Sequence, residues 1–120
     1  MAKILAVDDS RSMLNMVNYV LENAGYEVAR ASTGKEALAS AKNCSFDMVI
    51  SDVNMPEMDG FALVRALRQL PEYKKIPILM LTTESTQEKK NKGKQVGATG
   101  WIVKPFNPEQ MLAVIQKLLN

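Results

Sequence analysis

The sequence predicts one α/β domain in which a parallel, five-stranded sheet lies between two layers of helices, a doubly wound three-layer sandwich. Short apolar runs rich in β-branched residues alternate with amphipathic stretches along the whole chain, which indicates five β–α repeats. Right-handed crossovers between parallel strands then place helices on both faces of the sheet. A length of 120 residues suits one domain over 1–120, with no linker or low-complexity stretch inside it.

The strands are expected at the apolar runs, four of which have the continuity of strands that are buried on both faces of a sheet. The exception is a shorter run near 26–30. The predicted strands are 4–7, 26–30, 48–52, 77–81 and 100–103. We expect the flavodoxin-like order 2-1-3-4-5, in which the chain reverses direction across the sheet between strands 1 and 3.

The helices are located by apolar spacing and by residues that start or stop helices. Ser10 caps the first helix and Gly25 ends it, and Asp59 caps the third, which Pro71 ends. Pro108 suits the first turn of the last helix. Apolar residues at helical spacing mark the helices around 13–21, 33–42, 61–70 and 108–119, and a polar helix is expected over 86–96.

Composition excludes several classes of function. The net charge of +2 is too small to indicate nucleic-acid binding, and no apolar run approaches the roughly 18 residues of a membrane span. No signal peptide opens the chain, and its single cysteine, Cys44, cannot form an internal disulfide, so we expect a cytoplasmic protein. The absence of histidine removes serine–histidine and cysteine–histidine catalysis and most zinc sites.

Polar residues at the ends of four predicted strands form the candidate site. Asp8 and Asp9 follow the first strand and Asp52 ends the third. Thr82 and Lys104 follow the fourth and fifth strands. Because the carboxyl ends of parallel strands share one edge of the sheet, where ligands bind in such folds, these side chains are expected to meet.

A cluster of three neighbouring carboxylates needs a divalent cation or raised pKa values. Two of them about 4 Å apart repel by ~4 kcal/mol at an effective dielectric constant of about 20. An all-oxygen donor set favours Mg²⁺ or Mn²⁺, and a carboxylate beside such an ion can attack a phosphoryl group while Lys104 stabilises the developing charge. Alternatives stay open for single residues: Asp8 and Asp9 as helix caps, Lys104 as a surface lysine and Thr82 as an ordinary strand residue.

The ordered set Asp8-Asp9, SDVNMPEMDG around Asp52, LMLTTE around Thr82 and IVKPF around Lys104 resembles the receiver domains of two-component response regulators, most of all the single-domain chemotaxis regulators. The resemblance implies that Asp52 is the phosphoacceptor. It also implies that Asp9, Asp52 and the backbone carbonyl of Asn54 ligate Mg²⁺, with Asp8 holding it through water. Lys104 would pair with the phosphoryl group and Thr82 would donate a hydrogen bond to it.

The same resemblance implies partners and a switch. A histidine kinase or phosphotransfer domain would supply the phosphoryl group, and the domain would catalyse its own phosphorylation and slow self-dephosphorylation, tuned by Asn54 and Glu84. Thr82 and Trp101 would move together and alter the face formed by helix 86–96, strand 100–103 and helix 108–119. That face would bind an output protein, such as a flagellar motor switch, and we expect a monomer without membrane or nucleic-acid partners and without an effector domain.

The helix expected over 86–96 is polar nearly all round, carries four lysines and contains Gly93, which costs up to about 1 kcal/mol in a helix. Low local stability suits an element that moves on binding, and its charge favours an acidic partner segment. Lys90 occupies a position where motor-binding regulators often have an aliphatic residue. A simple solvated basic face is the alternative.

Other functions are less consistent with these motifs. A phosphatase of the haloacid-dehalogenase type needs D-x-D, and Asn54 cannot act as the general acid. A flavodoxin would need a phosphate-binding loop where Asp8 and Asp9 lie, and a metal-free interaction module would not need the acidic set. A phosphorelay intermediate or phosphate sink, not coupled to a flagellar motor, remains an alternative output.

Overall fold

The computed structural model describes residues 2–120 and confirms the predicted sandwich and strand order. The strands form one parallel sheet in the order β2-β1-β3-β4-β5. Their bounds are β1 Lys3–Val7, β2 Glu27–Ala31, β3 Met48–Ser51, β4 Ile78–Thr82 and β5 Gly100–Val103. The helices are α1 Arg11–Asn23, α2 Gly34–Asn43, α3 Gly60–Arg68, α4 Gln87–Val96 and α5 Pro108–Leu119, with a short 3₁₀ helix, η1, at Pro71–Tyr73.

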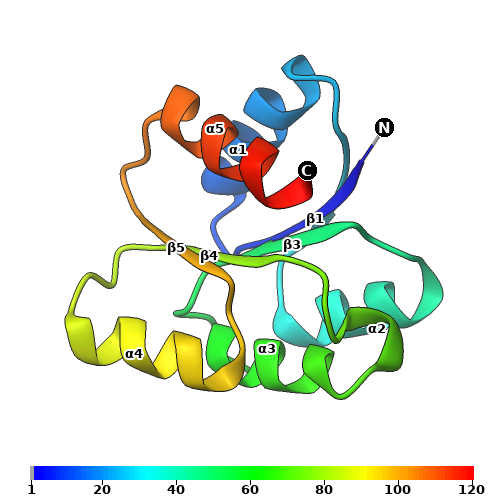
Figure 1. Cartoon of the computed structure of the whole chain (residues 1–120), viewed down its shortest axis with the longest axis vertical. Coiled ribbons are helices and arrows are strands. Elements are labelled where there is room, and N and C mark those ends of the chain that lie inside the picture. The colour runs from blue at the N-terminus through cyan, green and yellow to red at the C-terminus, as the bar shows by residue number, and fades with distance from the viewer. Residues whose placement is uncertain (1) are drawn as a thin grey trace.

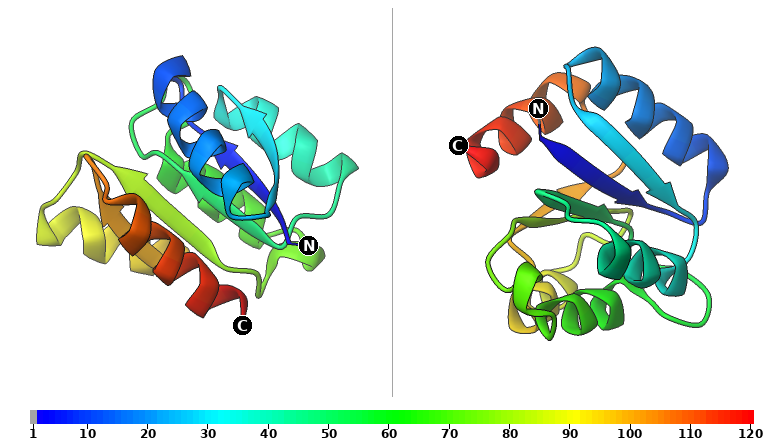
Figure 2. Two further views of the ribbon diagram at one scale, coloured as in Figure 1. Left: turned by 90° about the horizontal axis from the view of Figure 1, so that it is seen from above. Right: turned by 90° about the vertical axis from the view of Figure 1, so that its right-hand side faces the viewer.

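Helices cover both faces of the sheet, as Figure 1 shows: α1 and α5 lie on one face, and α2, α3 and α4 lie on the other. The two further views in Figure 2 show the same separation into layers. Side chains of β1, β3 and β4 alternate between two apolar clusters, one on each side of the sheet. Among the helices of residues 2–120, none is long and apolar enough to cross a membrane.

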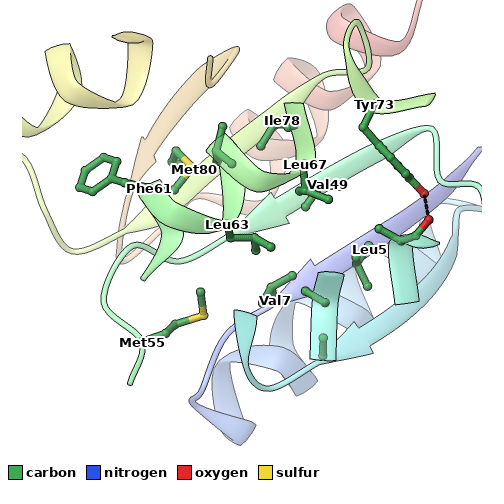
Figure 3. Close-up of a cluster of buried hydrophobic side chains, with 14 of the residues drawn as sticks. Leu5, Val7, Val49, Met55, Phe61, Leu63, Leu67, Tyr73, Ile78 and Met80 are labelled. Atoms are coloured by element: carbon green, nitrogen blue, oxygen red, sulfur yellow. Dashed lines mark hydrogen bonds between the residues drawn. The ribbon is translucent and has the colours of Figure 1, made fainter. Parts of the chain in front are cut away.

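The larger cluster lies beneath α2 and α3 and includes the phenol of Tyr73 (Figure 3). The Tyr73 hydroxyl accepts a hydrogen bond from Phe46 N (3.3 Å) and lies 2.8 Å from Ala41 O and 2.7 Å from Cys44 O. Burial raises the pKa of this phenol, so it stays protonated as a donor. Tyr73 thereby ties η1 to the end of α2.

Helix starts follow the predicted caps. Ser10 accepts a hydrogen bond from Met13 N at the start of α1, and Asp59 accepts one from Ala62 N at the start of α3. These side chains satisfy amide groups that have no partner inside the helix. The cap at Asp59 fixes the loop after β3, and thus the surroundings of Asp52.

Two predictions about elements were wrong in detail. Helix α3 ends at Arg68 rather than at Leu70, because Leu70 precedes Pro71 and is extended there (φ −83°, ψ 128°). The chain then forms η1, which was not predicted. Strand β5 is half-buried along its length rather than buried on both faces, because it is an edge strand that pairs with β4 alone.

Candidate functional site

The three aspartates meet at the carboxyl edge of the sheet. Strands β1 and β3 are neighbours in the register Val7↔Ser51, so Asp8 and Asp52 leave the sheet side by side. One carboxylate oxygen from each of Asp8, Asp9 and Asp52 lies within 4.8 Å of the others. Asp8 and Asp52 are buried and Asp9 is exposed, which leaves the cluster open on one side.

Lys104 reaches into this cluster from the end of β5. Its Nζ lies 2.7 Å from Asp8 Oδ2 and 3.5 Å from Asp52 Oδ2, and the exposed fractions of the three side chains are only 10%, 6% and 9%. Lys104 N donates to Thr82 O (2.8 Å), and the following Lys104–Pro105 bond is cis. Among the described residues, Lys104 thus supplies the positive charge that pairs with the two buried carboxylates.

Backbone amides orient the two buried acids. Ser10 N donates to Asp8 Oδ1 (2.9 Å), and Val53 N donates to Asp52 Oδ1 (2.7 Å). The second oxygen of each carboxylate is the one nearer Lys104. Gly60 approaches this loop so closely that a Cβ there would lie 2.2 Å from Asp52 O. The start of α3 therefore packs directly on the backbone of Asp52, and only glycine fits.

Thr82 and the rim of the site are linked through Glu84. Thr82 is fully buried, and its Oγ1 accepts a hydrogen bond from Glu84 N (3.3 Å), while no hydrogen bond joins it to a carboxylate within residues 2–120. Asn54 Nδ2 donates to Glu84 Oε2 (2.9 Å). The loops after β3 and β4 are therefore bridged beside Asp52.

Trp101 lies between α4 and α3. Its Nε1 donates to Glu84 O (2.9 Å), and its ring stacks on Phe61 with a centroid separation of 6.2 Å. A Cβ on Gly93 would lie 2.8 Å from Trp101 Cζ3. Gly93, interpreted from the sequence only as a weak point of its helix, thus has a packing role: it makes room for the indole.

The donor chemistry fits a hard divalent cation. The cluster supplies carboxylate oxygens and no sulfur or imidazole donor, and such sets prefer Mg²⁺ or Mn²⁺. Mutual repulsion of three acids would also be relieved by a divalent ion. The structure thus brings together Asp8, Asp9, Asp52 and Lys104, with Thr82 at the adjacent strand end.

Sequence reasoning missed the direct bond between Asn54 and Glu84 and the use of the Glu84 carbonyl by Trp101. The spacing of the two residues could have predicted their contact. Asn54 and Glu84 each lie two positions beyond a site residue on neighbouring strands β3 and β4, so their loops share one edge of the sheet.

Comparison with known proteins decides the family. The family model described as "Response regulator receiver domain" matches residues 4–116. The chain belongs to this family. As a receiver domain it is a signalling module of two-component systems, and it resembles the single-domain CheY proteins: it is 59% identical to chemotaxis protein CheY4 of Vibrio cholerae, with a TM-score of 0.95 and 98% of each chain covered.

Two other similar proteins differ more from this chain. PhoP of Bacillus subtilis, a transcriptional regulatory protein for alkaline phosphatase synthesis, is 38% identical over 98% of this chain and 48% of its own length. The chain spans about half the length of several such relatives. The receiver domain of sensor histidine kinase PA1611 from Pseudomonas aeruginosa, solved with a magnesium ion in its active-site cleft, is 25% identical, with a TM-score of 0.91 and coverage of 98% and 97%.

Proposed function

We propose that this receiver domain is a phosphorylation-dependent switch that accepts a phosphoryl group on Asp52. The observation that carries the proposal is the position of Asp52 Oδ2, 3.5 Å from Lys104 Nζ and within the three-carboxylate cluster. A buried carboxylate with an adjacent ammonium can act as a nucleophile toward phosphorus, since the cation stabilises negative charge on the transferring oxygens.

In this proposal, a carboxylate oxygen of Asp52 attacks the phosphorus of a phosphohistidine on a kinase or phosphotransfer domain. The new P–O bond forms as the P–N bond breaks, and the imidazole leaves with the electron pair. Lys104 pairs with the phosphoryl oxygens and Thr82 turns its hydroxyl to donate to one of them. These 120 residues contain no histidine, so the phosphohistidine must lie outside them.

Asp9, Asp52 and the backbone carbonyl of Asn54 would hold Mg²⁺ directly, with Asp8 holding it through water. The bound ion supplies charge neutralisation at the transferring oxygens. The magnesium ion in the cleft of the PA1611 receiver domain supports this assignment. The three carboxylates here lie within 4.8 Å of one another and supply the hard oxygen donors that Mg²⁺ prefers.

Incubation with acetyl phosphate and Mg²⁺ tests the proposal. We expect intact mass to rise by one phosphoryl group in the natural chain and to stay unchanged in Asp52→Asn, which keeps the size of the side chain but loses its nucleophilic charge. Omission of Mg²⁺ is the matched control and should slow the gain strongly. Equal modification of both chains, or of neither, would refute the assignment of Asp52.

Trp101 is proposed to report the switch. Phosphorylation adds roughly −1.5 to −2 charges at Asp52. If Thr82 moves toward the phosphoryl group, its hydrogen bond with Glu84 N breaks. The carbonyl of Glu84 then moves, and the hydrogen bond that Trp101 Nε1 donates to it is lost. We expect a shift in Trp101 fluorescence when Mg²⁺ and beryllofluoride are added together. The Asp52→Asn chain should show none, and a silent indole in a chain with proven modification would exclude Trp101 from the switch.

Asn54 and Glu84 are proposed to tune the loss of the phosphoryl group. Their hydrogen bond spans the two loops beside Asp52, where a hydrolytic water must approach. Glu84→Ala should release the Asn54 amide and change the dephosphorylation rate severalfold, measured as the decay of phosphorylated mass after acetyl phosphate is removed. Glu88→Ala, an acid on α4 exposed to solvent, serves as the control. Identical decay in all three chains would show that the bond has no such role.

The output is proposed to be a protein bound at the face formed by α4, β5 and α5, in a cytoplasmic pathway. The 59% identity to a chemotaxis protein supports chemotaxis as that pathway. Affinity capture with the phosphorylated chain distinguishes a flagellar motor switch from a phosphorelay intermediate or phosphate sink, for which only phosphotransfer partners would be recovered.

A further inference from the structure

A groove between α3 and α4 gathers three cations, on the flank of α4 that faces away from Trp101 and β5. Arg65 of α3 and Lys89 and Lys92 of α4 line this groove, which has a volume of about 390 Å³. The only acid in its lining is Glu88. We refer to it as the α3–α4 groove.

The two lysines of the α3–α4 groove are held in place by an aromatic ring, and none of its three cations has a carboxylate partner among residues 2–120. The Nζ atoms of Lys92 and Lys89 lie 4.8 Å and 6.0 Å from the ring centroid of Phe61, which orients both ammoniums by cation–π attraction. Within residues 2–120, the ion pairs use Lys3, Lys35 and Lys104, and none includes Arg65, Lys89 or Lys92. Three positively charged side chains thus line one groove, and each can still form an ion pair.

We propose that the α3–α4 groove binds an acidic segment of a partner protein, separately from the α4–β5–α5 face. Helices α3 and α4 lie side by side below the sheet in Figure 1, and α4 has ten residues. A helix of that length spans about 15 Å, which matches a short peptide segment. Carboxylates on such a segment would complement the three cations and avoid Glu88.

The structure disfavours other anionic partners at this groove. Single-stranded nucleic acid needs exposed aromatic rings for base stacking, but Phe61 is only 3% exposed beneath its lysines. A membrane surface needs apolar side chains that can insert. The large exposed apolar residues of the described chain, Met16 and Tyr19, lie on α1, on the opposite face of the sheet.

Helix α4 provides its own matched control. Lys90 and Lys94 line a different hollow, next to Trp101, on the β5 side of the same helix. The double variants K89Q/K92Q and K90Q/K94Q therefore remove the same charge from the same helix but from opposite flanks. Glutamine keeps a good helix propensity, so both variants should retain α4.

The test measures binding of a fluorescein-labelled peptide of alternating Glu and Ala to the full, unphosphorylated chain at low salt. We expect K89Q/K92Q to weaken binding by at least about tenfold and K90Q/K94Q by less than about twofold. Glu88→Gln should tighten it. In the natural chain, amide shifts on peptide titration should concentrate in α3 and α4, on the residues around Arg65 and Lys92.

An equal loss in both double variants would overturn the proposal, since it would show attraction to the net charge alone. Amide shifts confined to the β5 flank would overturn it as well, and this mapping decides the matter if circular dichroism shows that a variant is unfolded. Tighter binding of a single-stranded oligonucleotide or of phosphatidylserine vesicles through Lys89 and Lys92 would refute the choice of partner. Because the chain is unphosphorylated, none of these outcomes depends on the role of Asp52.

Discussion

Lys104→Met should slow phosphorylation by acetyl phosphate about 10²- to 10³-fold, the usual cost of removing one donor to a developing negative charge. The same substitution should lower the free energy of unfolding by ~3 kcal/mol without Mg²⁺, because it leaves buried Asp8 and Asp52 without their cation. Saturating Mg²⁺ should restore most of this stability, since a divalent ion replaces the missing charge. The measurements are the rate of mass gain and urea unfolding with and without Mg²⁺.

Lys35→Met is the control for this prediction. Lys35 also pairs with an acid at 3.5 Å, but the side chains of Lys35 and Glu57 are 75% and 74% exposed. Removal of such a pair changes stability by less than about 1 kcal/mol. If Lys104→Met and Lys35→Met lose equal stability, or if Mg²⁺ fails to rescue the former, the ammonium does not neutralise the site.

Arg68→Met should lower the free energy of unfolding by roughly 2–4 kcal/mol, although Arg68 lies outside the site. The Arg68 guanidinium donates to three backbone carbonyls: Nη1 to Tyr73 O and Ile76 O, both at 2.7 Å, and Nη2 to Gly97 O at 2.7 Å. It thereby ties the end of α3 to η1, to the start of β4 and to the end of α4. Desolvation lowers the pKa of Arg68, but a guanidinium remains charged at neutral pH.

Arg65→Met provides the comparison, because Arg65 lies one turn earlier on α3 and is exposed. Arg65→Met should change the free energy of unfolding, measured by urea unfolding, by no more than about 0.5 kcal/mol. Arg68→Lys should recover only part of the loss, since one ammonium cannot span three separate carbonyls. Equal midpoints for Arg65→Met and Arg68→Met would show that water replaces the guanidinium without cost.

The sheet and the acidic cluster were predictable because they depend on local patterns. Continuous apolar runs located β1, β3 and β4, and the crossover rule then placed Asp8, Asp52 and Lys104 at one edge. Side-chain caps were equally local: Ser10 and Asp59 start their helices as expected. Strand order puts Asp8 and Asp52 on neighbouring strands, whereas Lys104 follows β5, two strands from β3, and meets the acids only through the length of its side chain.

Features that depend on three-dimensional packing could not be predicted. An arginine near the end of a helix is usually exposed, and nothing in its neighbours indicates that Arg68 meets carbonyls from residues 73, 76 and 97. The 3₁₀ turn at Pro71–Tyr73 depends on the buried phenol of Tyr73. The half-burial of β5 follows from its place at the edge of the sheet, which its apolar sequence does not reveal.

The close packing of the Trp101 ring against Gly93 limits which substitutions α4 can accept. Alanine at position 93 would raise the intrinsic helix stability of α4 by about 1 kcal/mol. Its methyl group would collide with the six-membered ring of the indole. A smaller aromatic ring at position 101 would leave room for that methyl group. The same smaller ring opposite Gly93 would leave a cavity under the helix. Positions 93 and 101 are therefore a size-matched pair, and stabilising substitutions in α4 must be designed together with the ring on the neighbouring strand.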